Sequence, residues 1–493
     1  MKAIIVGGGI GGLTTALMLR TRGIDCEIFE QADSVRELGV GINTLPHAIK
    51  ELAQLGLLPR LDQVGIRTHE LFYMNRIGQE IWREPRGTDA GFEYPQFSIH
   101  RGRLQAVIYD AVRELGVGIN TLPHAIKELA QLGLLSKLDQ VGIRTHELFY
   151  MNRIGQEIWR EPRGTDAGFE YPQFSIHRGR LQAVIYQTTR ARLGESRIHC
   201  GHRLGSFTQD EGGITCYFFG RDGSHRATVR ADILIGADGI HSIVRETLYP
   251  NEGPARWNGS MLWRGATDWP KFLTGRSMVI AGGMAGKLVV YPIGEGARED
   301  KPLTNWAVLV KIGEGGAPPR KEDWSRAGKF EDLMPHVQRF NIPFVDAKAL
   351  IESTPEFWEY PMCDRDPLPH WSHGRVTLLG DAAHPMYPVG SNGASQAILD
   401  ARCLADRLRE ADHIGQALWA YEQERLPMTA QIVQSNRSGG PEGVIDAVEQ
   451  RAPDGFDNID NVLSYEERKA IVRGYAAKAG FAKEQVNKSN KVA

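Results

Sequence analysis

The sequence contains little cysteine, no excess of charge of either sign and no long apolar run. Its five cysteines, Cys26, Cys200, Cys216, Cys363 and Cys403, form neither a CxxC pair nor a cluster with metal-ligand spacing. We therefore predict no metal site and no disulfide framework, and we expect reduced thiols in a cytoplasmic protein. The 58 basic and 60 acidic residues form no basic stripe. This balance argues against nucleic acid and a membrane surface as partners. No segment reaches the roughly 20 apolar residues of a membrane span, which favours a small-molecule partner.

Part of the sequence occurs twice. Residues 35–109 recur as residues 112–186, at an offset of 77 positions (112 minus 35), and the copies differ only at Pro59/Ser136 and Arg60/Lys137. Solenoids and propellers need at least three diverged units. We therefore interpret the repeat as a tandem duplication with one surplus copy. The surplus copy carries its own apolar segments, AIKELAQLGLL and ELFYM, which predicts aggregation, swapping or proteolysis.

The first 30 residues predict a strand, a tight turn, a helix and a second strand. An apolar run at residues 3–6 precedes Gly7, Gly9 and Gly12, which form a GxGxxG motif. The first glycine turns the chain, the second admits a pyrophosphate and the third lets the helix pack closely. Glu30 ends the second strand, at the position where a carboxylate accepts hydrogen bonds from both hydroxyls of an adenosine ribose. The alternative is a solvated glutamate at a strand end.

Two later segments repeat the pattern of a strand followed by a turn and a helix. ADILIGADGIHSIVR, residues 231–245, turns at Asp238 and Gly239. GRVTLLGDAAHPMYPVGSNGASQAILDARCLADRL, residues 374–408, turns at Gly380 and Asp381 and continues through a glycine-rich loop into a long amphipathic helix. Each motif occurs once, so we expect one cofactor site despite the repeat.

These three ordered motifs make the chain resemble the single-component, class A FAD-dependent aromatic hydroxylases of the para-hydroxybenzoate hydroxylase type. Within this family it is most similar to the phenazine hydroxylases of pyocyanin biosynthesis, in runs such as RELGVGIN, YPQFSIHRGRLQ, YPMCDRDPLPHW and GSNGASQAILD. The resemblance covers nearly all of residues 1–437 once one copy is set aside. It implies an α/β fold, in which a Rossmann-like FAD-binding domain is interleaved with a mixed β-sheet substrate domain, plus C-terminal helices.

We expect the two domains to alternate along the chain. The runs SMVIA, KLVVYPI and NWAVLVKI have strand length, and THELFYMNRIGQEIWRE predicts a hairpin in the same substrate sheet. A capped helix beginning at Ser464 is interpreted as a docking or homodimer-contact helix. The expected boundaries are 1–70, 187–250 and 366–437 for the FAD-binding domain, 251–365 for the substrate sheet, 35–109 and 112–186 for the repeat, and 438–493 for a C-terminal extension.

The resemblance assigns cofactor contacts to residues that match the family's motifs. Asp381 would accept a hydrogen bond from a ribityl hydroxyl of FAD, or act only as a helix N-cap. Gly390 to Ser395 would present helix amides to the pyrimidine edge of the flavin. Asp238 would serve FAD and NAD(P)H binding, or form only a turn and a cap. The expected cofactor-binding residues are Gly7, Gly9, Gly12, Glu30, Gly41, Ile42, Arg101, Arg178, Asp238, Asp381, Gly390, Asn392, Gly393 and Ala394.

The repeat leaves the choice of copy open for two of these contacts. Gly41 and Ile42, or Gly118 and Ile119, would place backbone against the isoalloxazine. The first arginine of HRGRL, Arg101 or Arg178, would reach the pyrophosphate or ribityl region. Either copy, or a crossover between them, keeps the chain continuous. Our hypothesis is that Gly41 and Ile42 of the first copy and Arg178 of the second copy contact FAD.

The implied activity is a monooxygenase reaction. NAD(P)H reduces FAD, O2 reacts with the reduced flavin, and a C4a-hydroperoxyflavin hydroxylates an aromatic ring. No metal is required, and no side chain is assigned as catalytic. His384 is not expected to be a base, because the oxidant lies on the flavin. Alternatives are a related flavin dehydrogenase or oxidase without hydroxylation, and an FAD-binding protein inactivated by the duplication. Most of the aromatic residues in the substrate half are expected in the core and one or two beside the substrate: Trp257, Trp263, Tyr291, Trp306, Phe357, Trp358 and Tyr360.

Overall fold

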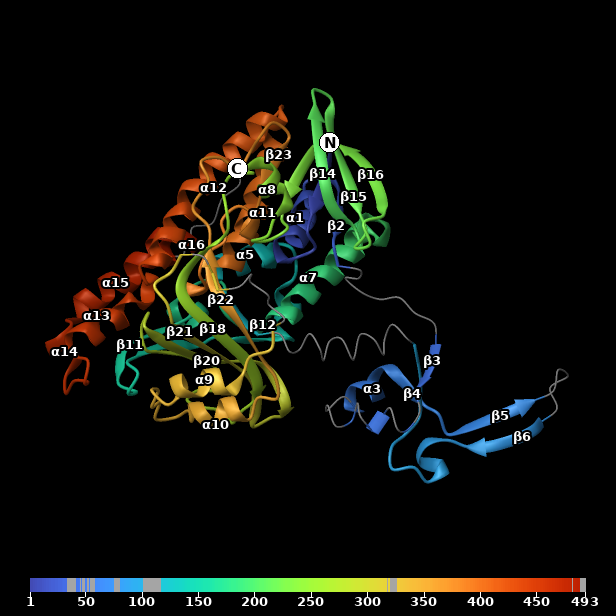
Figure 1. Cartoon of the computed structure of the whole chain (residues 1–493), viewed down its shortest axis with the longest axis horizontal. Coiled ribbons are helices and arrows are strands. Elements are labelled where there is room, and N and C mark those ends of the chain that lie inside the picture. The colour runs from blue at the N-terminus through green and yellow to red at the C-terminus, as the bar shows by residue number, and fades with distance from the viewer. Residues whose placement is uncertain are drawn as a thin grey trace. The chain divides into compact units, whose positions relative to one another are not determined.

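The computed structural model divides the chain into two compact units, which we describe separately. Unit 1 comprises Met1–Asp33 and Val117–Ala493, and unit 2 comprises Ser34–Gly116. The second repeat copy therefore belongs almost entirely to unit 1, and the first copy makes up unit 2 (Figure 1). The residues that the structure describes are 1–32, 41–44, 46, 49–50, 53, 58–74, 80–100, 117–316, 318–319, 326–480 and 482–487.

The predicted Rossmann-like sheet of unit 1 is present. Its five strands follow the order β13-β2-β1-β17-β23, and all neighbours are parallel. Buried apolar residues dominate β1 and β17, as expected where helices cover both faces of a parallel sheet. The strands are β1 (Lys2–Val6), β2 (Asp25–Glu30), β13 (Ile198–Cys200), β17 (Ile233–Gly236) and β23 (Val376–Leu378), and the packed helices are α1 (Ile10–Thr21), α7 (Arg178–Leu193) and α11 (Gly393–Glu410).

The substrate sheet is the second layer of unit 1 and has seven strands in the order β11-β10-β19-β20-β21-β18-β22. Neighbours are antiparallel except β10 and β19. The hairpin of the second copy, β10 and β11, joins this sheet as predicted. The helices α9 (Phe330–Val337) and α10 (Ala347–Glu352) lie below it in Figure 1. The strands are β10 (Glu147–Met151), β11 (Glu157–Pro162), β18 (Arg256–Asp268), β19 (Ser277–Ala281), β20 (Gly286–Arg298), β21 (Lys301–Lys311) and β22 (Phe357–Asp364).

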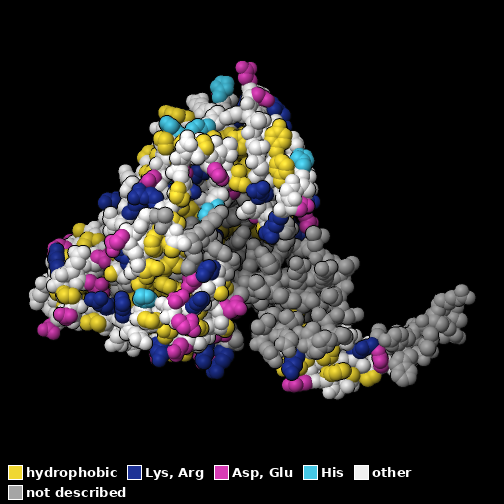
Figure 2. Space-filling model, viewed as in Figure 1, with side chains coloured by type: hydrophobic (Ala, Val, Ile, Leu, Met, Phe, Trp, Pro, Cys, Tyr) yellow, Lys and Arg dark blue, Asp and Glu magenta, His cyan; other side chains and the backbone are white. Residues whose placement is uncertain are grey.

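Smaller elements complete unit 1. One antiparallel sheet has the order β8-β12-β9, and a meander has the order β14-β15-β16. No helix in the described part of the chain is long and apolar enough to cross a membrane. In Figure 2 acidic and basic side chains are interspersed over the visible face. The remaining bounds are β8 (Gly118–Thr121), α5 (Pro123–Gln131), α6 (Leu135–Asp139), β9 (Gly142–Arg144), β12 (Phe174–His177), β14 (Arg203–Asp210), β15 (Gly213–Phe219), β16 (His225–Ala231) and α8 (Ile243–Leu248).

The C-terminal extension packs within its own unit. The predicted capped helix is present as α15, and Ser464 and Glu467 form a capping box at its start. It packs against α12, α13 and the short helical turn η6. This intramolecular docking accounts for its apolar face. The elements are α12 (Ile414–Arg437), η6 (Gly440–Glu442), α13 (Gly443–Arg451), α14 (Ile459–Val462), α15 (Tyr465–Lys478) and α16 (Lys483–Val486).

Unit 2 repeats the local pairings of the second copy. Gly41 pairs with His100 as Gly118 pairs with His177. The hairpin of β5 and β6 has the register of β10 and β11. Among the described residues β5 pairs only with β6, whereas β10 also pairs with β19. The elements are β3 (Gly41–Thr44), α3 (Leu58–Val64), β4 (Gly65–Arg67), β5 (Glu70–Met74), β6 (Glu80–Pro85) and β7 (Phe97–His100).

The end of the repeat explains why the last residues of the second copy form the start of α7. Helix α7 runs through Tyr186, the last repeated residue, to Leu193, and Thr188 and Thr189 beyond the repeat are buried. If the first copy formed the start of this helix, the chain would leave it after Tyr109 and re-enter at position 187, in mid-helix. Such a break removes backbone hydrogen bonds from a packed helix. With the second copy in place, the surplus residues fall in the connection between β2 and β8.

A buried ion-pair network holds the GD motif. The Asp400 carboxylate of α11 accepts hydrogen bonds from Arg425 Nε at 2.7 Å, His384 Nε2 at 2.6 Å and the Gly380 amide at 3.1 Å. Burial alone would raise the pKa of Asp400, but attraction to His384 and Arg425 outweighs it and lowers the pKa to about 2. His384 therefore pairs with a buried carboxylate, and the expectation that it is not a catalytic base stays a prediction.

We expect Asp400→Asn to lower the free energy of unfolding by about 3–5 kcal/mol, because it breaks a buried ion pair. The folded-state pKa lies below the unfolded value of about 3.9, so this contribution is complete above about pH 5 and is lost as the pH falls toward 2. Urea unfolding from pH 7 to pH 3 measures the difference. Asp406→Asn, on the same helix but partly exposed, is the control and is expected to cost about 1 kcal/mol or less. A difference for Asp400→Asn that stays constant down to pH 3 would contradict the assignment.

Candidate FAD and substrate site

A cavity of about 880 Å³ extends from the GxGxxG turn to the substrate sheet, and every lining residue belongs to unit 1. Its first end lies beyond the carboxyl ends of β1 and β2, where parallel α/β sheets bind ligands. Its other end is lined by side chains of β18 to β22. The two predicted domains therefore share one site.

The three glycines of the first motif have the distinct roles that the motif predicts. Gly7 has φ +108°, and a Cβ there would lie 2.4 Å from the Ala237 oxygen. A Cβ on Gly12 would lie 2.0 Å from the Gly7 oxygen, so Gly12 permits the close approach of helix α1. A Cβ on Gly9 would meet no atom within 4 Å, and Gly9 lines the cavity. Gly9 is therefore the position where a ligand can approach the backbone.

Glu30 is held at the end of β2 by backbone donors. Its Oε2 accepts from the Gly8 amide at 2.6 Å and its Oε1 accepts from the Ala32 amide at 2.8 Å. Each carboxylate oxygen has a second lone pair. Glu30 lines the cavity, so its carboxylate remains able to accept hydrogen bonds from a ribose. Its contact with the cofactor stays a prediction.

Asp238 both caps a helix and lines the cavity. Its Oδ2 accepts from the Ile243 amide at 2.8 Å, and its Oδ1 accepts from the Ser242 hydroxyl at 2.6 Å, at the start of α8. Burial raises the pKa of Asp238, and these hydrogen bonds oppose the effect. The cap that we considered as an alternative is thus present at the cavity wall.

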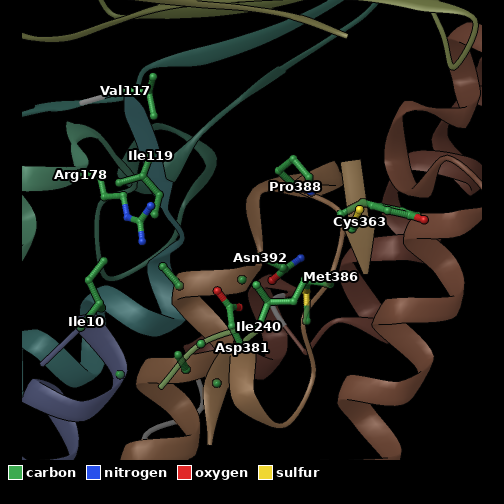
Figure 3. Close-up of a pocket in the computed structure, with 18 of the residues that line it drawn as sticks. Ile10, Val117, Ile119, Arg178, Ile240, Cys363, Asp381, Met386, Pro388 and Asn392 are labelled. Carbon is green, nitrogen blue, oxygen red and sulfur yellow. The ribbon is translucent and has the colours of Figure 1, made fainter. Parts of the chain in front are cut away.

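The GD motif and the glycine-rich loop form the opposite wall. Figure 3 shows Asp381 and Asn392 on one side of the cavity and Arg178 on the other. Asp381 lies in the helical turn η4 (Gly380–Ala382), so it is not the N-cap of α11, which is Asn392. Gly393 and Ala394 begin α11 and line the cavity with Asn392. Gly390 is not among the lining residues; it has φ +66° in the preceding turn η5 (Val389–Ser391).

The second copy supplies the remaining predicted contacts. Gly118, Ile119 and Arg178 line the cavity, and the Gly118 amide donates to Asn305 Oδ1 at 2.7 Å. The hypothesis that Gly41 and Ile42 occupy this place is wrong for this structure. They lie in β3 of unit 2, whereas the cavity of unit 1 is lined by Gly118 and Ile119. The predicted residue Arg101 lies outside the described residues.

The substrate end carries polar groups that no short motif indicated. The Arg264 guanidinium lies 4.7 Å from the ring centroid of Tyr360, and both residues line the cavity with Tyr291. Removal from bulk water lowers the pKa of Arg264, although a guanidinium stays charged. Of the predicted aromatics, Tyr291 and Tyr360 line the cavity. Trp263, Trp306 and Phe357 belong to a hydrophobic core cluster.

Sequence reasoning also missed Gln182, Lys287, Asn305 and Glu442. Gln182 Nε2 donates to the Gly8 oxygen at 2.9 Å, which ties α7 to the glycine turn. Lys287 and Glu442 form an ion pair at the cavity wall. Partners this distant in sequence form no local pattern. No group of metal-ligating side chains occurs in the described ranges.

The residues present fit an FAD. Gly9 leaves open space for a pyrophosphate, Glu30 lies where an adenosine ribose belongs, and helix α11 points its N-terminal residues into the cavity. Helix N-termini favour negative charge, and a reduced flavin carries it on its pyrimidine ring. Between the Glu30 end and the α11 end of the cavity, Asp381 provides a hydrogen-bond acceptor and Arg178 provides a cation. The set therefore matches the cofactor in the order and polarity of its groups.

We expect Gly9→Val to weaken FAD binding to the apoprotein by about a hundredfold, or about 2.7 kcal/mol, because its side chain would enter the space at Gly9. The melting temperature of the apoprotein should stay unchanged, since no protein atom lies within 4 Å of that Cβ. Gly12→Ala is the comparison and should lower the apoprotein melting temperature itself. Fluorescence titration and thermal unfolding measure the two effects, and equal destabilisation of both apoproteins would contradict the assignment.

Comparisons with known proteins agree with this geometry. Residues 1–436 match the family described as FAD binding domain. The phenazine 1,6-dicarboxylic acid hydroxylase PhzS of Lysobacter antibioticus is 42% identical over 350 residues, which cover 69% of this chain and 85% of that protein. The 3-hydroxybenzoate 6-hydroxylase 1 of Aquipseudomonas alcaligenes is 27% identical over 436 residues, with 87% of this chain and 86% of that protein covered.

The fold is also found among solved structures. Klebsiella pneumoniae HpxO complexed with FAD and uric acid has a TM-score of 0.62 at 19% identity, covering 99% of this chain and 96% of that chain. The 2,6-dihydroxypyridine-3-hydroxylase from Arthrobacter nicotinovorans has a TM-score of 0.58 at 18% identity, with 89% and 91% covered. The family match extends over most of the chain and includes all three motifs of the cavity. The chain belongs to the FAD-binding domain family of flavoproteins.

Proposed function

We propose that this chain is an FAD-dependent monooxygenase that hydroxylates a carboxylated aromatic compound of two or three fused rings, with NAD(P)H and O2 as co-substrates. Its relatives are named as hydroxylases of aromatic acids, a phenazine dicarboxylic acid among them. The observation that carries the proposal is the position of Arg264 beside Tyr360 and Tyr291, in the same cavity as the cofactor-binding motifs.

The charge of Arg264 supports a carboxylated substrate. A guanidinium presents two parallel donors that match a carboxylate, and such pairs are strongest where water is excluded. The rings of Tyr291 and Tyr360 offer flat apolar surface beside it. We infer that Arg264 binds the substrate carboxylate and that the tyrosines orient the ring system toward the cofactor.

Apolar side chains complete this end of the cavity. Met278, Ile280, Val289 and Leu309 line it from three adjacent strands. Bound FAD, once reduced by NAD(P)H, supplies the activated oxygen for the aromatic ring. The protein's part is to hold the ring near the flavin and to keep water away from the reaction. No side chain is required as an acid or base in this proposal.

The test is a panel of aromatic compounds, including phenazine-1-carboxylate and 3-hydroxybenzoate. NAD(P)H oxidation, hydrogen peroxide and product mass are measured together. A hydroxylated product that forms in step with NAD(P)H oxidation is expected for at least one carboxylated fused-ring compound. NAD(P)H oxidation that yields hydrogen peroxide alone would favour the flavin oxidase or dehydrogenase. An FAD-bound protein that NAD(P)H never bleaches would favour the inactive FAD-binding protein.

The location and assembly inferred from the sequence remain part of this proposal. We propose a cytoplasmic protein, in keeping with its five free cysteines. We also propose a homodimer, which sedimentation of the purified protein would test.

A further inference from the structure

The C-terminal extension, which lies beyond the family match, contributes a side chain to the cavity. The match ends at residue 436, and Glu442 ends the turn η6 that follows it. Glu442 lines the cavity together with Lys287, the second residue of β20. The wall of the site is therefore built partly from residues outside the shared family domain.

Glu442 joins two walls of the cavity. Its Oε2 accepts from Lys287 Nζ, and each of these side chains is only 6% exposed. Its Oε1 accepts from the Gly390 amide at 3.3 Å. One carboxylate thus links the substrate sheet to the glycine-rich loop that precedes α11.

Further contacts from the extension hold both walls. The Tyr475 hydroxyl of α15 donates to Asn436 Oδ1 and accepts from Asn392 Nδ2, each at 2.8 Å. Asp446 Oδ1 accepts at 2.8 Å from the amide of Met284, in the turn between β19 and β20. Asn392 and Met284 both line the cavity. The extension therefore contacts two separate parts of the cavity wall.

A buried ion pair that joins two walls carries a desolvation penalty. Its desolvation penalty often cancels its attraction, so it contributes little net stability, whereas the loss of one partner leaves a charge inside the protein. At the wall of a binding cavity, that charge would act directly on a ligand. The charges of Lys287 and Glu442 neutralise each other at this part of the wall.

We propose that Glu442 is a positioning and specificity-determining residue of the site. It holds the glycine-rich loop against the sheet through Gly390, and it neutralises Lys287 so that the carboxylate of an aromatic ligand is directed to Arg264. The ligand class rests on the proposed function. The role of Glu442 at the loop does not depend on it.

The test compares Glu442→Gln, Lys287→Met and the double variant. Glu442→Gln keeps the size of the side chain and an acceptor for the Gly390 amide, but it leaves Lys287 without its counter-charge. Dissociation constants for phenazine-1-carboxylate and phenazine-1-carboxamide are measured from the change in flavin absorbance. Glu466→Gln, in an exposed pair with Lys469 on α15, is the control.

We expect Glu442→Gln to shift the preference for the carboxylate over the carboxamide upward by about tenfold, and Lys287→Met to shift it downward by a similar factor. The double variant should return within about threefold of the wild-type preference, and Glu466→Gln should not change it. A pair with a purely structural role would change both affinities by the same factor in every variant, and that result would overturn the proposal.

A second measurement separates this inference from the proposed function. If neither aromatic binds the wild-type protein, the proposed ligand class is wrong, and FAD titration of the apoprotein then tests Glu442 alone. Glu442→Ala should weaken FAD binding by about tenfold through loss of the Gly390 contact. Glu442→Gln should weaken it less than threefold. Equal FAD affinities in all three proteins would overturn the inference.

Discussion

Arg178→Ala is expected to weaken FAD binding to the apoprotein by about tenfold to a hundredfold, whereas Arg101→Ala is expected to leave it unchanged. A hydrogen bond to a charged group contributes about 1.5–3 kcal/mol. Arg178 begins α7, its amide donates to the Val117 oxygen at 3.1 Å, and its side chain lies in the cavity opposite Asp381 (Figure 3). The guanidinium is thus placed for the pyrophosphate or ribityl region of FAD.

The repeat supplies the control for this experiment within the same molecule. Arg101 and Arg178 each occupy the first arginine of an HRGRL sequence, so the two substitutions have the same local chemistry. Flavin fluorescence during titration of the apoprotein measures both affinities. A loss of affinity on Arg101→Ala with none on Arg178→Ala would show that the first copy forms the site. Equal partial losses would show that the molecules divide between the two copies.

Deletion of residues 35–111 is expected to give a chain that binds FAD as the full chain does and unfolds at a higher temperature. Every residue that lines the cavity lies in unit 1, outside the deleted segment. Shortening the connection between β2 and β8 lowers its closure cost by about 2 kcal/mol, or about 2 °C in melting temperature for a chain of this size. Deletion also removes β5 and β6, which form a separate two-stranded sheet. Scanning calorimetry and FAD titration measure the two effects.

Deletion of residues 110–186 provides the matched control. Both products have 416 residues (493 minus 77) and differ only at Pro59/Ser136 and Arg60/Lys137. Ser136 lies exposed in the first turn of α6, where proline is tolerated, and Lys137 Nζ donates to Thr188 Oγ1 at 3.0 Å. We expect the two melting temperatures to agree within about 1 °C, or about 1 kcal/mol. An insoluble product, or one without FAD affinity, would show that the surplus copy takes part in the fold.

Local patterns carried most of the fold prediction. The GxGxxG turn and Glu30 are places where a backbone geometry needs particular residues, so both were recognisable in sequence. The alternation of strands and helices predicted the parallel sheet, and strand-length apolar runs predicted the substrate sheet. The single occurrence of each cofactor motif predicted one site, and in the described part of the chain all three motifs line the same cavity.

The residues that sequence reasoning missed are joined across long separations. Asn305 meets Gly118, and Lys287 meets Glu442. Such pairs come together only when β20 and β21 lie beside β8 and the C-terminal extension folds back on the sheet. The charge at the wall of the cavity depends on these contacts, so it could not be read from any one segment.

By itself, the sequence determined the class of the fold and the cofactor motifs, because these depend on local geometry. It also contains the repeat itself, and the interpretation of one copy as surplus stays a prediction. Only the tertiary structure decided which copy forms the site. The copies differ at only two positions and their described strands have the same registers, so local preference does not separate them. The difference arises at the end of the repeat, where α7 continues through Tyr186 into Gln187 and packs as one helix. A continuous helix keeps its hydrogen bonds, so the end of the second copy forms the first turns of α7.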